Sequence, residues 1–219
     1  MGGARACKDR IVVLDLRVCF IGESFVAGVG DQKCLGWAGR LASRAIGAGQ
    51  PLTYYNLGIR RENSTELRER WAGECAPRLP EGADCRVVIS TGVNDTQFEN
   101  GSPRVDPDDS LRNMAAILRE VRERGWQAMV VAPPPNVDDE HNARIVALDG
   151  RYADLCEETK VPYLRAHQPL RENQIWMRDI AAGDGSHPGA AGYDEFAALL
   201  APHWLLWLAD PGSELPVVR

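Results

Sequence analysis

The stretch that decides the fold is Arg17-Val18-Cys19-Phe20-Ile21-Gly22-Glu23-Ser24. Its apolar residues run without interruption into a glycine, and a serine follows two residues later. A short continuous apolar run that ends at glycine is typical of a strand covered on both faces. Four similar runs follow at intervals of a few dozen residues. They occupy residues 53–57, 86–91, 128–132 and 161–164.

Helical patterns separate these runs. Apolar residues recur at helical spacing across residues 35–46. The segment Asn63-Ser64-Thr65-Glu66 has the residue types of a capping box and predicts the start of another helix. Further apolar stripes begin at Leu111, Ile145 and Tyr193. The alternation of strands and helices predicts an α/β fold, a three-layer α/β/α sandwich around a parallel sheet.

Composition limits the classes of function. The chain has 219 residues, of which 44% are apolar, and this is enough for one α/β domain with a full core. A net charge of −6 argues against nucleic-acid binding and against docking on an anionic membrane. No segment approaches the ~20 apolar residues of a membrane-spanning helix. We therefore expect no nucleic-acid partner and no integral membrane segment.

Domain limits and cysteine usage complete the outline. We expect residues 1–16 to be an N-terminal extension, residues 17–209 a single domain and residues 210–219 a C-terminal tail. The 6 cysteines contain no C-x-x-C pair and no disulfide framework, which predicts a reduced chain in the cytoplasm. Cysteine and histidine residues do not cluster with the spacing of metal ligands, so we expect no metal site.

Polar residues follow the predicted strands where a functional site would form. In a parallel sheet, ligands bind beyond the carboxyl ends of the strands. Ser24 lies beyond the first strand, Gly58 beyond the second and Asn94 beyond the third. Asp184 and His187, shortly before the last helix, can lie side by side on one turn. A carboxylate that orients an imidazole, and an imidazole that deprotonates a serine, are the parts of a serine hydrolase.

These blocks resemble the SGNH (GDSL-like) family of lipases and acylhydrolases. The four residues that name the family match Ser24, Gly58, Asn94 and His187 in chain order, and the blocks span residues 17–208. The last block, from Asp184 to Pro188, also has the family's Asp-x-x-His-Pro pattern. The resemblance implies a flavodoxin-like five-stranded parallel sheet of order 2-1-3-4-5.

The resemblance also implies a cofactor-independent ester hydrolase that works through an acyl-enzyme. Ser24 would be the nucleophile, His187 the base and Asp184 its orienting acid. The backbone amides of Ser24 and Gly58 and the carboxamide of Asn94 would bind the oxyanion. One departure is visible, because the family's usual aspartate before the serine is replaced here by Glu23.

Structural interpretations compete with some of these roles. Ser24 could cap the helix after the first strand, and Asn94 could form an Asx turn. Four further residues are candidates for substrate binding. They are Phe25, Arg60, Phe98 and Trp176. The aromatic rings could line an acyl or alcohol pocket and the arginine could bind an anionic group, or the rings could pack in the core and the arginine could be solvated.

Other classes of function stay open from the sequence. The same residues would serve an O-acyltransferase or a carbohydrate acetylesterase. A nucleotide-binding α/β module is a further alternative, because the segment from Gly22 to Gly30 is rich in glycine. The stretch that begins at Gly28 lacks the third glycine of a dinucleotide-binding motif, however. We expect a small-molecule ester as the partner, and a homo-oligomer stays open.

Overall fold

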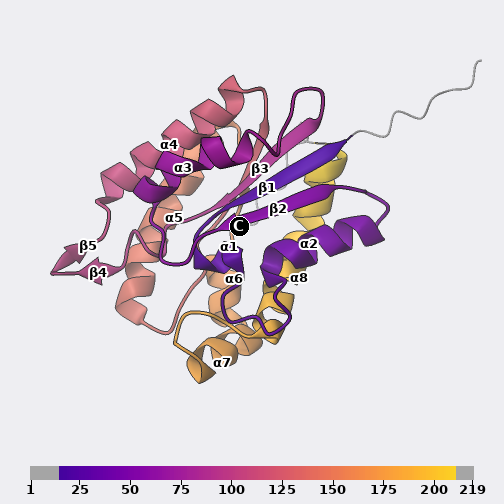
Figure 1. The fold of residues 1–219 in the computed structure, drawn as a ribbon. Helices are drawn as coiled ribbons and strands as arrows, with labels where there is room; N and C mark the ends of the chain where they lie inside the picture. The colour runs from indigo at the N-terminus through magenta and orange to yellow at the C-terminus, as the bar shows by residue number, and fades with distance from the viewer. Residues whose placement is uncertain (1–14, 211–219) are drawn as a thin grey trace, which may run out of the picture.

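The computed structural model describes residues 15–210, and within them five parallel strands form one sheet. The strands are β1 (Leu16–Gly22), β2 (Thr53–Gly58), β3 (Asp84–Ser90), β6 (Gln127–Val131) and β7 (Tyr163–Leu164). Their order across the sheet is β2-β1-β3-β6-β7 (Figure 1). Because β4 and β5 lie outside this sheet, the order is the predicted 2-1-3-4-5. The three-layer α/β/α fold class is confirmed.

Helices cover both faces of the sheet (Figure 1). On one face lie α1 (Ser24–Ala27), α2 (Gly36–Gly47), α6 (His167–Glu172), α7 (Gln174–Ala182) and α8 (Ala190–Ala209). On the other lie α3 (Ser64–Cys75), α4 (Pro107–Glu123) and α5 (Asp139–Thr159). The capping box at the start of α3 is present, because the Asn63 side chain accepts the Glu66 amide and the Glu66 carboxylate accepts the Asn63 amide.

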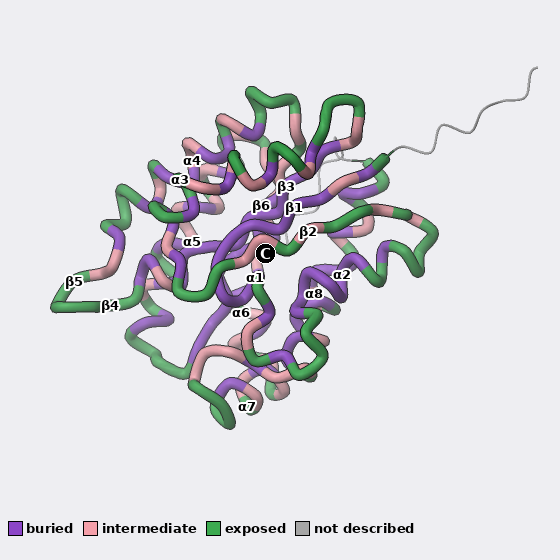
Figure 2. The backbone as a smooth tube through the Cα atoms, in the orientation of Figure 1, coloured by how far each residue is buried: buried purple, intermediate pink, exposed green. Residues whose placement is uncertain are grey.

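Several short elements were not predicted from the sequence. They are α1, α6, α7 and a hairpin formed by β4 (Phe98–Glu99) and β5 (Ser102–Pro103). With four and six residues, α1 and α6 are too short to show a helical period. The hairpin projects from the body of the molecule and is largely exposed (Figure 2). All four elements border the carboxyl end of the sheet, where the site is expected.

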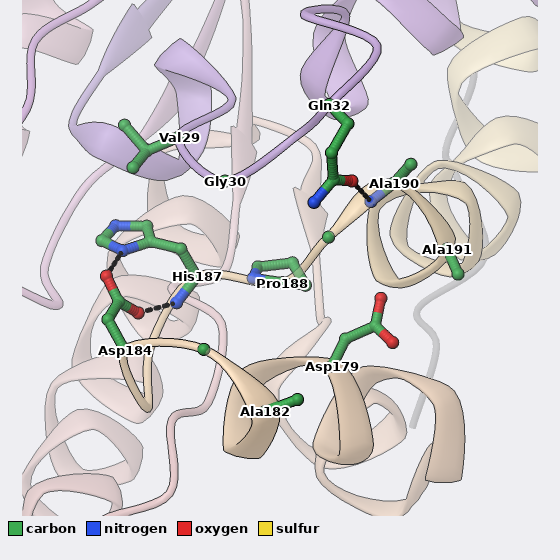
Figure 3. A pocket seen from close by; sticks show the side chains of 12 residues that line it. Val29, Gly30, Gln32, Asp179, Ala182, Asp184, His187, Pro188, Ala190 and Ala191 are labelled. Atoms are coloured by element: carbon green, nitrogen blue, oxygen red, sulfur yellow. Dashed lines mark hydrogen bonds and ion pairs between the residues drawn. The ribbon is translucent and has the colours of Figure 1, made fainter.

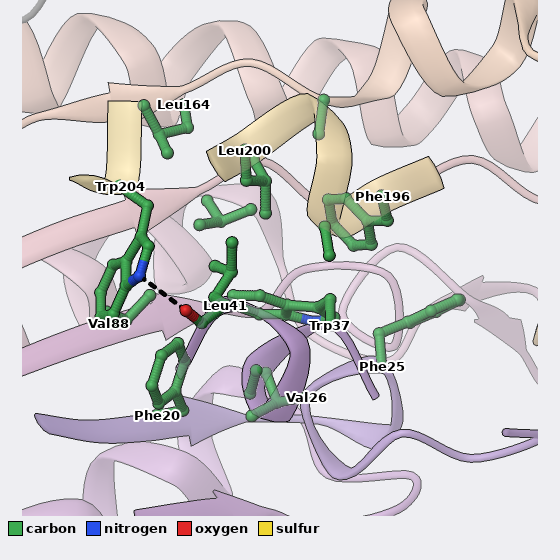
Figure 4. Packing of buried hydrophobic residues seen from close by; sticks show 14 of the residues in the cluster. Phe20, Phe25, Val26, Trp37, Leu41, Val88, Leu164, Phe196, Leu200 and Trp204 are labelled. Carbon is green, nitrogen blue, oxygen red and sulfur yellow. Dashed lines mark hydrogen bonds between the residues drawn. The ribbon is translucent and has the colours of Figure 1, made fainter. Parts of the chain in front are cut away.

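One hydrophobic core lies between the sheet and the α2–α8 layer (Figure 4). Phe20 of β1 packs edge-on against Trp37 of α2, with ring centroids 5.4 Å apart. The Trp204 indole N–H donates to the Leu41 carbonyl at 3.0 Å, which ties α8 to α2. Burial of each large apolar side chain contributes roughly 1.5–3 kcal/mol. This core therefore fixes α8, the helix that follows His187.

A second core lies on the opposite face of the sheet. Cys19 and Ile21 of β1 pack there with Trp71 of α3 and Tyr152 of α5. Successive side chains of a strand point to opposite faces. A strand covered on both faces must therefore be apolar throughout, which explains the continuous run that opens this chain.

The described chain ends close to the expected domain limits. β1 begins at Leu16, which pairs with Asp84, so the first strand starts within the segment expected to be an extension. α8 ends at Ala209. The rest of the expected extension and tail, residues 1–14 and 211–219, lies outside the described residues. In residues 15–210 no helix is long and apolar enough to cross a membrane.

Candidate active site

The carboxyl ends of adjacent strands bring the candidate residues together. In the sheet register Gly22, the last residue of β1, pairs with Gly58 on one side and with Ser90 on the other. The backbone of Gly22 has a φ of 142°, and a Cβ there would lie 1.9 Å from the Ser90 carbonyl oxygen. Glycine is therefore required for the turn that carries Glu23 and places Ser24 at the start of α1.

Three side chains form a continuous hydrogen-bonded chain. The Ser24 hydroxyl lies 2.7 Å from His187 Nε2, and His187 Nδ1 lies 2.7 Å from Asp184 Oδ2. Because an ionised carboxylate can only accept hydrogen bonds, His187 Nδ1–H donates to Asp184. Nε2 then accepts a hydrogen bond from the Ser24 hydroxyl. The structure thus brings together the residues that the sequence predicts as nucleophile, base and orienting acid.

The loop before α8 holds Asp184 against His187 (Figure 3). Asp184 Oδ1 accepts the backbone amides of Ser186 and His187 at 3.0 and 2.8 Å, while Oδ2 faces the imidazole. Burial acts to raise the pKa of Asp184, but these hydrogen bonds outweigh it and lower the pKa to about 2. The carboxylate is therefore ionised at neutral pH, as an orienting acid must be.

Two of the predicted substrate-binding aromatic residues pack behind the imidazole. Phe25 is buried, and its ring centroid lies 4.9 Å from that of His187. Trp176 is also buried, stacks on Phe25, and donates its indole N–H to the Pro135 carbonyl at 3.2 Å. Neither ring is accessible in this structure, because each packs against the other between α1 and α7. Their part in substrate binding stays a prediction.

The other two predicted substrate-binding residues lie at the surface. Arg60 is exposed just beyond Gly58 and the end of β2. Phe98 is 46% exposed on the β4–β5 hairpin, and the Arg144 guanidinium lies 4.4 Å from the centre of its ring. Both are accessible, and their part in substrate binding stays a prediction.

Gly58 is required by packing. A Cβ at this position would lie 2.2 Å from the backbone nitrogen of Ala27 in α1. The Gly58 amide donates to Asn56 Oδ1 at 3.1 Å, and Asn56 Nδ2 donates to the Val26 carbonyl at 2.7 Å. The absence of a side chain at Gly58 therefore lets α1 pack closely against the end of β2.

The Asn94 carboxamide faces two protein acceptors. Its Nδ2 donates to Glu23 Oε2 at 2.6 Å and to the Glu62 carbonyl at 3.0 Å. The Asn94 backbone amide also donates to Glu23 Oε2, at 3.0 Å. The carboxamide is therefore bound to the turn that carries Ser24. Nothing in the sequence pattern indicated this pairing.

Sequence reasoning missed a buried ion network beside the site. Arg40 of α2 pairs with Asp31 and Asp194 and donates to the Ala190 carbonyl at 3.0 Å. Asp31 lies in the loop after α1, and Ala190 opens α8 directly after the loop that carries His187. The network therefore joins the segment after Ser24 to the segment after His187. An arginine in an amphipathic helix gives no sequence signal for such a role.

His141 is a second residue that the sequence did not single out. Its Nδ1 accepts from Asn136 Nδ2 at 2.7 Å, and its Nε2 faces the Val93 carbonyl and the Thr96 hydroxyl, each at 3.0 Å. Burial lowers the pKa of His141, which favours the neutral ring. The imidazole thus braces the turn that carries Asn94.

A cavity of about 600 Å³ adjoins Asp184 and His187 (Figure 3). Its wall includes Gln32, which accepts the Ala190 amide at 3.0 Å, and Asp179, which accepts the Gly192 amide at 2.9 Å. These two side chains cap α8 from outside the helix. Ser24 is not among the lining residues. In residues 15–210 no cluster of His, Cys, Asp or Glu side chains is placed to hold a metal ion.

The fold and the hydrogen-bonded chain define a hydrolase of the SGNH type. Residues 20–195 match the GDSL-like lipase/acylhydrolase family. The chain belongs to this family, whose members are hydrolases acting on ester bonds, as the sequence resemblance predicted. No curated protein matches the chain in sequence.

Solved structures share the fold at low identity. A lipase/acylhydrolase from Enterococcus faecalis has a TM-score of 0.70 and 18% identity over 86% of this chain and 94% of its own. An acetylxylan esterase from Geobacillus stearothermophilus has a TM-score of 0.70 and 17% identity over 94% of this chain and 99% of its own. A psychrotrophic esterase from Pseudoalteromonas has a TM-score of 0.69 and 16% identity over 90% of this chain and 100% of its own. At these identities the likeness shows a common fold.

Proposed function

We propose that Ser24, His187 and Asp184 are a catalytic triad that hydrolyses carboxylic esters. The observation that carries the proposal is the pair of 2.7 Å contacts that His187 makes, one to the Ser24 hydroxyl and one to Asp184. This geometry lets the imidazole take the Ser24 proton when the hydroxyl attacks an ester.

The proposed reaction has two halves. Ser24 Oγ attacks the ester carbonyl carbon while His187 Nε2 takes its proton, and a tetrahedral oxyanion forms. When this intermediate collapses, the bond to the alcohol oxygen breaks and His187 gives the proton to the leaving alkoxide. Water then attacks the acyl carbon while His187 Nε2 takes a proton from it, and a second tetrahedral intermediate forms. When this intermediate collapses, the bond to Ser24 Oγ breaks, His187 returns the proton to Oγ, and the acid is released. Asp184 stabilises the imidazolium in both halves.

The oxyanion would be bound by the Ser24 amide, the Gly58 amide and the Asn94 carboxamide. One such donor typically contributes ~10²–10³ in kcat. In this structure the Gly58 amide donates to Asn56, and the Asn94 carboxamide donates to Glu23 and Glu62. These two donors must therefore leave their present acceptors before they can serve an oxyanion.

We infer a small or soluble ester as substrate, since the sequence has no long apolar lid segment. One structural neighbour is described as an acetylxylan esterase, so acetylated sugars belong in the substrate series. An O-acyltransferase would use the same triad and is distinguished by a new ester product when an alcohol is added. The nucleotide-binding alternative loses its main support, because packing within the protein explains the glycine at position 28. A Cβ on Gly28 would lie 2.8 Å from the Cα of Gly36.

The triad is tested by hydrolysis of p-nitrophenyl acetate. We expect the purified protein to be active and Ser24→Ala to lose at least ~10³-fold in kcat while it stays folded. A phosphonate ester should label Ser24, and mass spectrometry of the digested protein locates the adduct. Full activity in folded Ser24→Ala, or an adduct on another residue, would refute the mechanism.

A further inference from the structure

The departure from the family pattern at Glu23 has a defined structural result. Glu23 is 1% exposed, and its carboxylate accepts three N–H donors from the next strand end. These are the Val93 amide at 3.0 Å, the Asn94 amide at 3.0 Å and Asn94 Nδ2 at 2.6 Å. The carboxylate of the residue before the nucleophile therefore binds the side chain expected to stabilise the oxyanion.

The second hydrogen of the carboxamide is also bound. Asn94 Nδ2 donates to the Glu62 carbonyl at 3.0 Å. Glu62 is itself held by Arg70, whose guanidinium also donates to the Leu57 carbonyl at 2.8 Å. A carboxamide has two N–H hydrogens, and here both have buried protein acceptors. Neither can serve an oxyanion until one of these hydrogen bonds is exchanged.

We propose that Glu23 is a positioning residue that withholds the Asn94 carboxamide from the oxyanion and so limits the rate of ester hydrolysis. This inference rests on the proposed function. An anionic acceptor at 2.6 Å competes directly with a developing oxyanion for the same N–H. An aspartate at this position would be shorter by one methylene, about 1.5 Å, and would withdraw from Nδ2.

The surroundings of Glu23 make its proposed effect on kcat dependent on pH. Burial raises the pKa of Glu23 to about 8, and nearby Asp95 also raises it, against the hydrogen bonds from Val93 and Asn94. Tyr152 of α5 also interacts electrostatically with Glu23. A protonated carboxyl has fewer acceptor positions than a carboxylate. The hydrogen bond from Asn94 to Glu23 is therefore strongest above pH 8, where Glu23 is ionised. The wild-type kcat should fall as pH rises through about 8.

The test is Glu23→Asp in the full chain, assayed on p-nitrophenyl acetate across a pH range and compared with wild type above pH 8, where the Glu23 carboxyl is ionised. We expect kcat to rise about 10-fold, part of the ~10²–10³ that one oxyanion donor contributes, and the fall near pH 8 to disappear. The matched control is Glu195→Asp, because Glu195 Oε2 likewise accepts from an asparagine carboxamide, Asn173 Nδ2, at 2.8 Å. The control should leave kcat and its pH profile unchanged.

Two results would overturn the inference. One is an unchanged or lower kcat in folded Glu23→Asp, which would mean that Glu23 presents Asn94 to the substrate or only supports the turn. The other is an equal gain from Glu23→Asp when Asn94 is already alanine. In either case loss of activity in Ser24→Ala would still support the triad, so the two proposals fail separately.

A direct measurement covers the case in which Glu23→Asp does not fold. Nitrogen-15 NMR follows the Asn94 side-chain amide in the wild-type chain before and after a phosphonate reacts with Ser24. We expect the chemical shift of this amide to change with pH near 8 in the free protein. It should also change when the phosphonate oxygen accepts a hydrogen bond from one of the two amide hydrogens. An Asn94 signal that changes in neither experiment would contradict the proposal.

Discussion

Single residues set the charge state of the site, and Asp184 illustrates this best. Its carboxylate accepts three N–H groups from a loop of four residues, two from the backbone and one from the imidazole. These hydrogen bonds hold the pKa at about 2, below its ordinary value of 3.8. The folded state therefore binds this proton more weakly than the unfolded chain does. The resulting stability is present above pH 3.8 and is lost as pH falls through about 2.

Asp184→Asn separates catalysis from stability. We expect kcat on p-nitrophenyl acetate to fall about 10³–10⁴-fold, because the amide no longer fixes the imidazole tautomer or stabilises its charged form. At pH 7 the free energy of unfolding should fall by no more than about 1 kcal/mol, since the side chain is half exposed and screened by solvent. Urea unfolding at several pH values checks the second part. The difference from wild type should vanish near pH 2, and a difference that grows in acid would contradict the assigned sign.

Secondary-structure elements place Ser24 beside His187, and α2 is an element that connects the segments after these two residues. Its Arg40 pairs with Asp31, in the loop after α1, and donates to the Ala190 carbonyl at the start of α8. Arg44, one turn later on the same helix, also donates to α8, at the Ala197 carbonyl. Only the first of these arginines touches the loops that carry the site.

Arg40→Met should therefore impair catalysis, and Arg44→Met should not. A misplacement of about 1 Å can cost about 10²-fold in rate, so we expect kcat to fall about 10- to 100-fold in folded Arg40→Met with KM little changed. The buried Asp31 left without its partner should also lower the free energy of unfolding, by about 3–5 kcal/mol. Arg40→Lys, which keeps the charge, should recover part of both losses. Equal kcat values for folded Arg40→Met and Arg44→Met would refute the role of the network.

Much of this arrangement could be predicted from local patterns. The continuous apolar run ending at Gly22 predicted a strand buried on both faces, and Asn63 with Glu66 predicted the cap of α3. The rule that strand ends share one edge predicted that Ser24 would meet the late Asp–His pair. The geometry agrees with that expectation, while the catalytic roles stay a prediction.

The features that could not be predicted depend on contacts between distant segments. The burial of Phe25 follows from α7 stacking on it, and the sequence around Phe25 looks the same whether or not a helix covers the ring. The partners of Asn94 depend on the length of the Glu23 side chain and on where the Glu62 carbonyl lies. No spacing rule in one dimension fixes such distances.

At the scale of the whole molecule, α8 links the site to the middle of the sheet. Its first residues follow the loop of His187, and its last carbonyls, at Trp207 and Leu208, accept from the Arg86 guanidinium of β3. Arg86 also pairs with Asp84. The central strand, β3, is thus connected to the C-terminal end of α8. Loss of the contact at the C-terminal end of α8 should therefore weaken the fold as a unit.

Arg86→Met tests this connection, and Arg17→Met is its matched control. Both arginines lie on sheet strands and pair with an aspartate two residues earlier, but the Arg86 side chain is 3% exposed and the Arg17 side chain 29%. Removing a buried partner leaves the carbonyls of α8 without a donor, so we expect Arg86→Met to lose about 3–5 kcal/mol of unfolding free energy. The exposed pair should contribute about 0–1 kcal/mol. Urea denaturation followed by tryptophan fluorescence measures both losses, because Trp207 lies against Arg86. Similar losses in the two variants would show that the connection between Arg86 and α8 does not stabilise the fold.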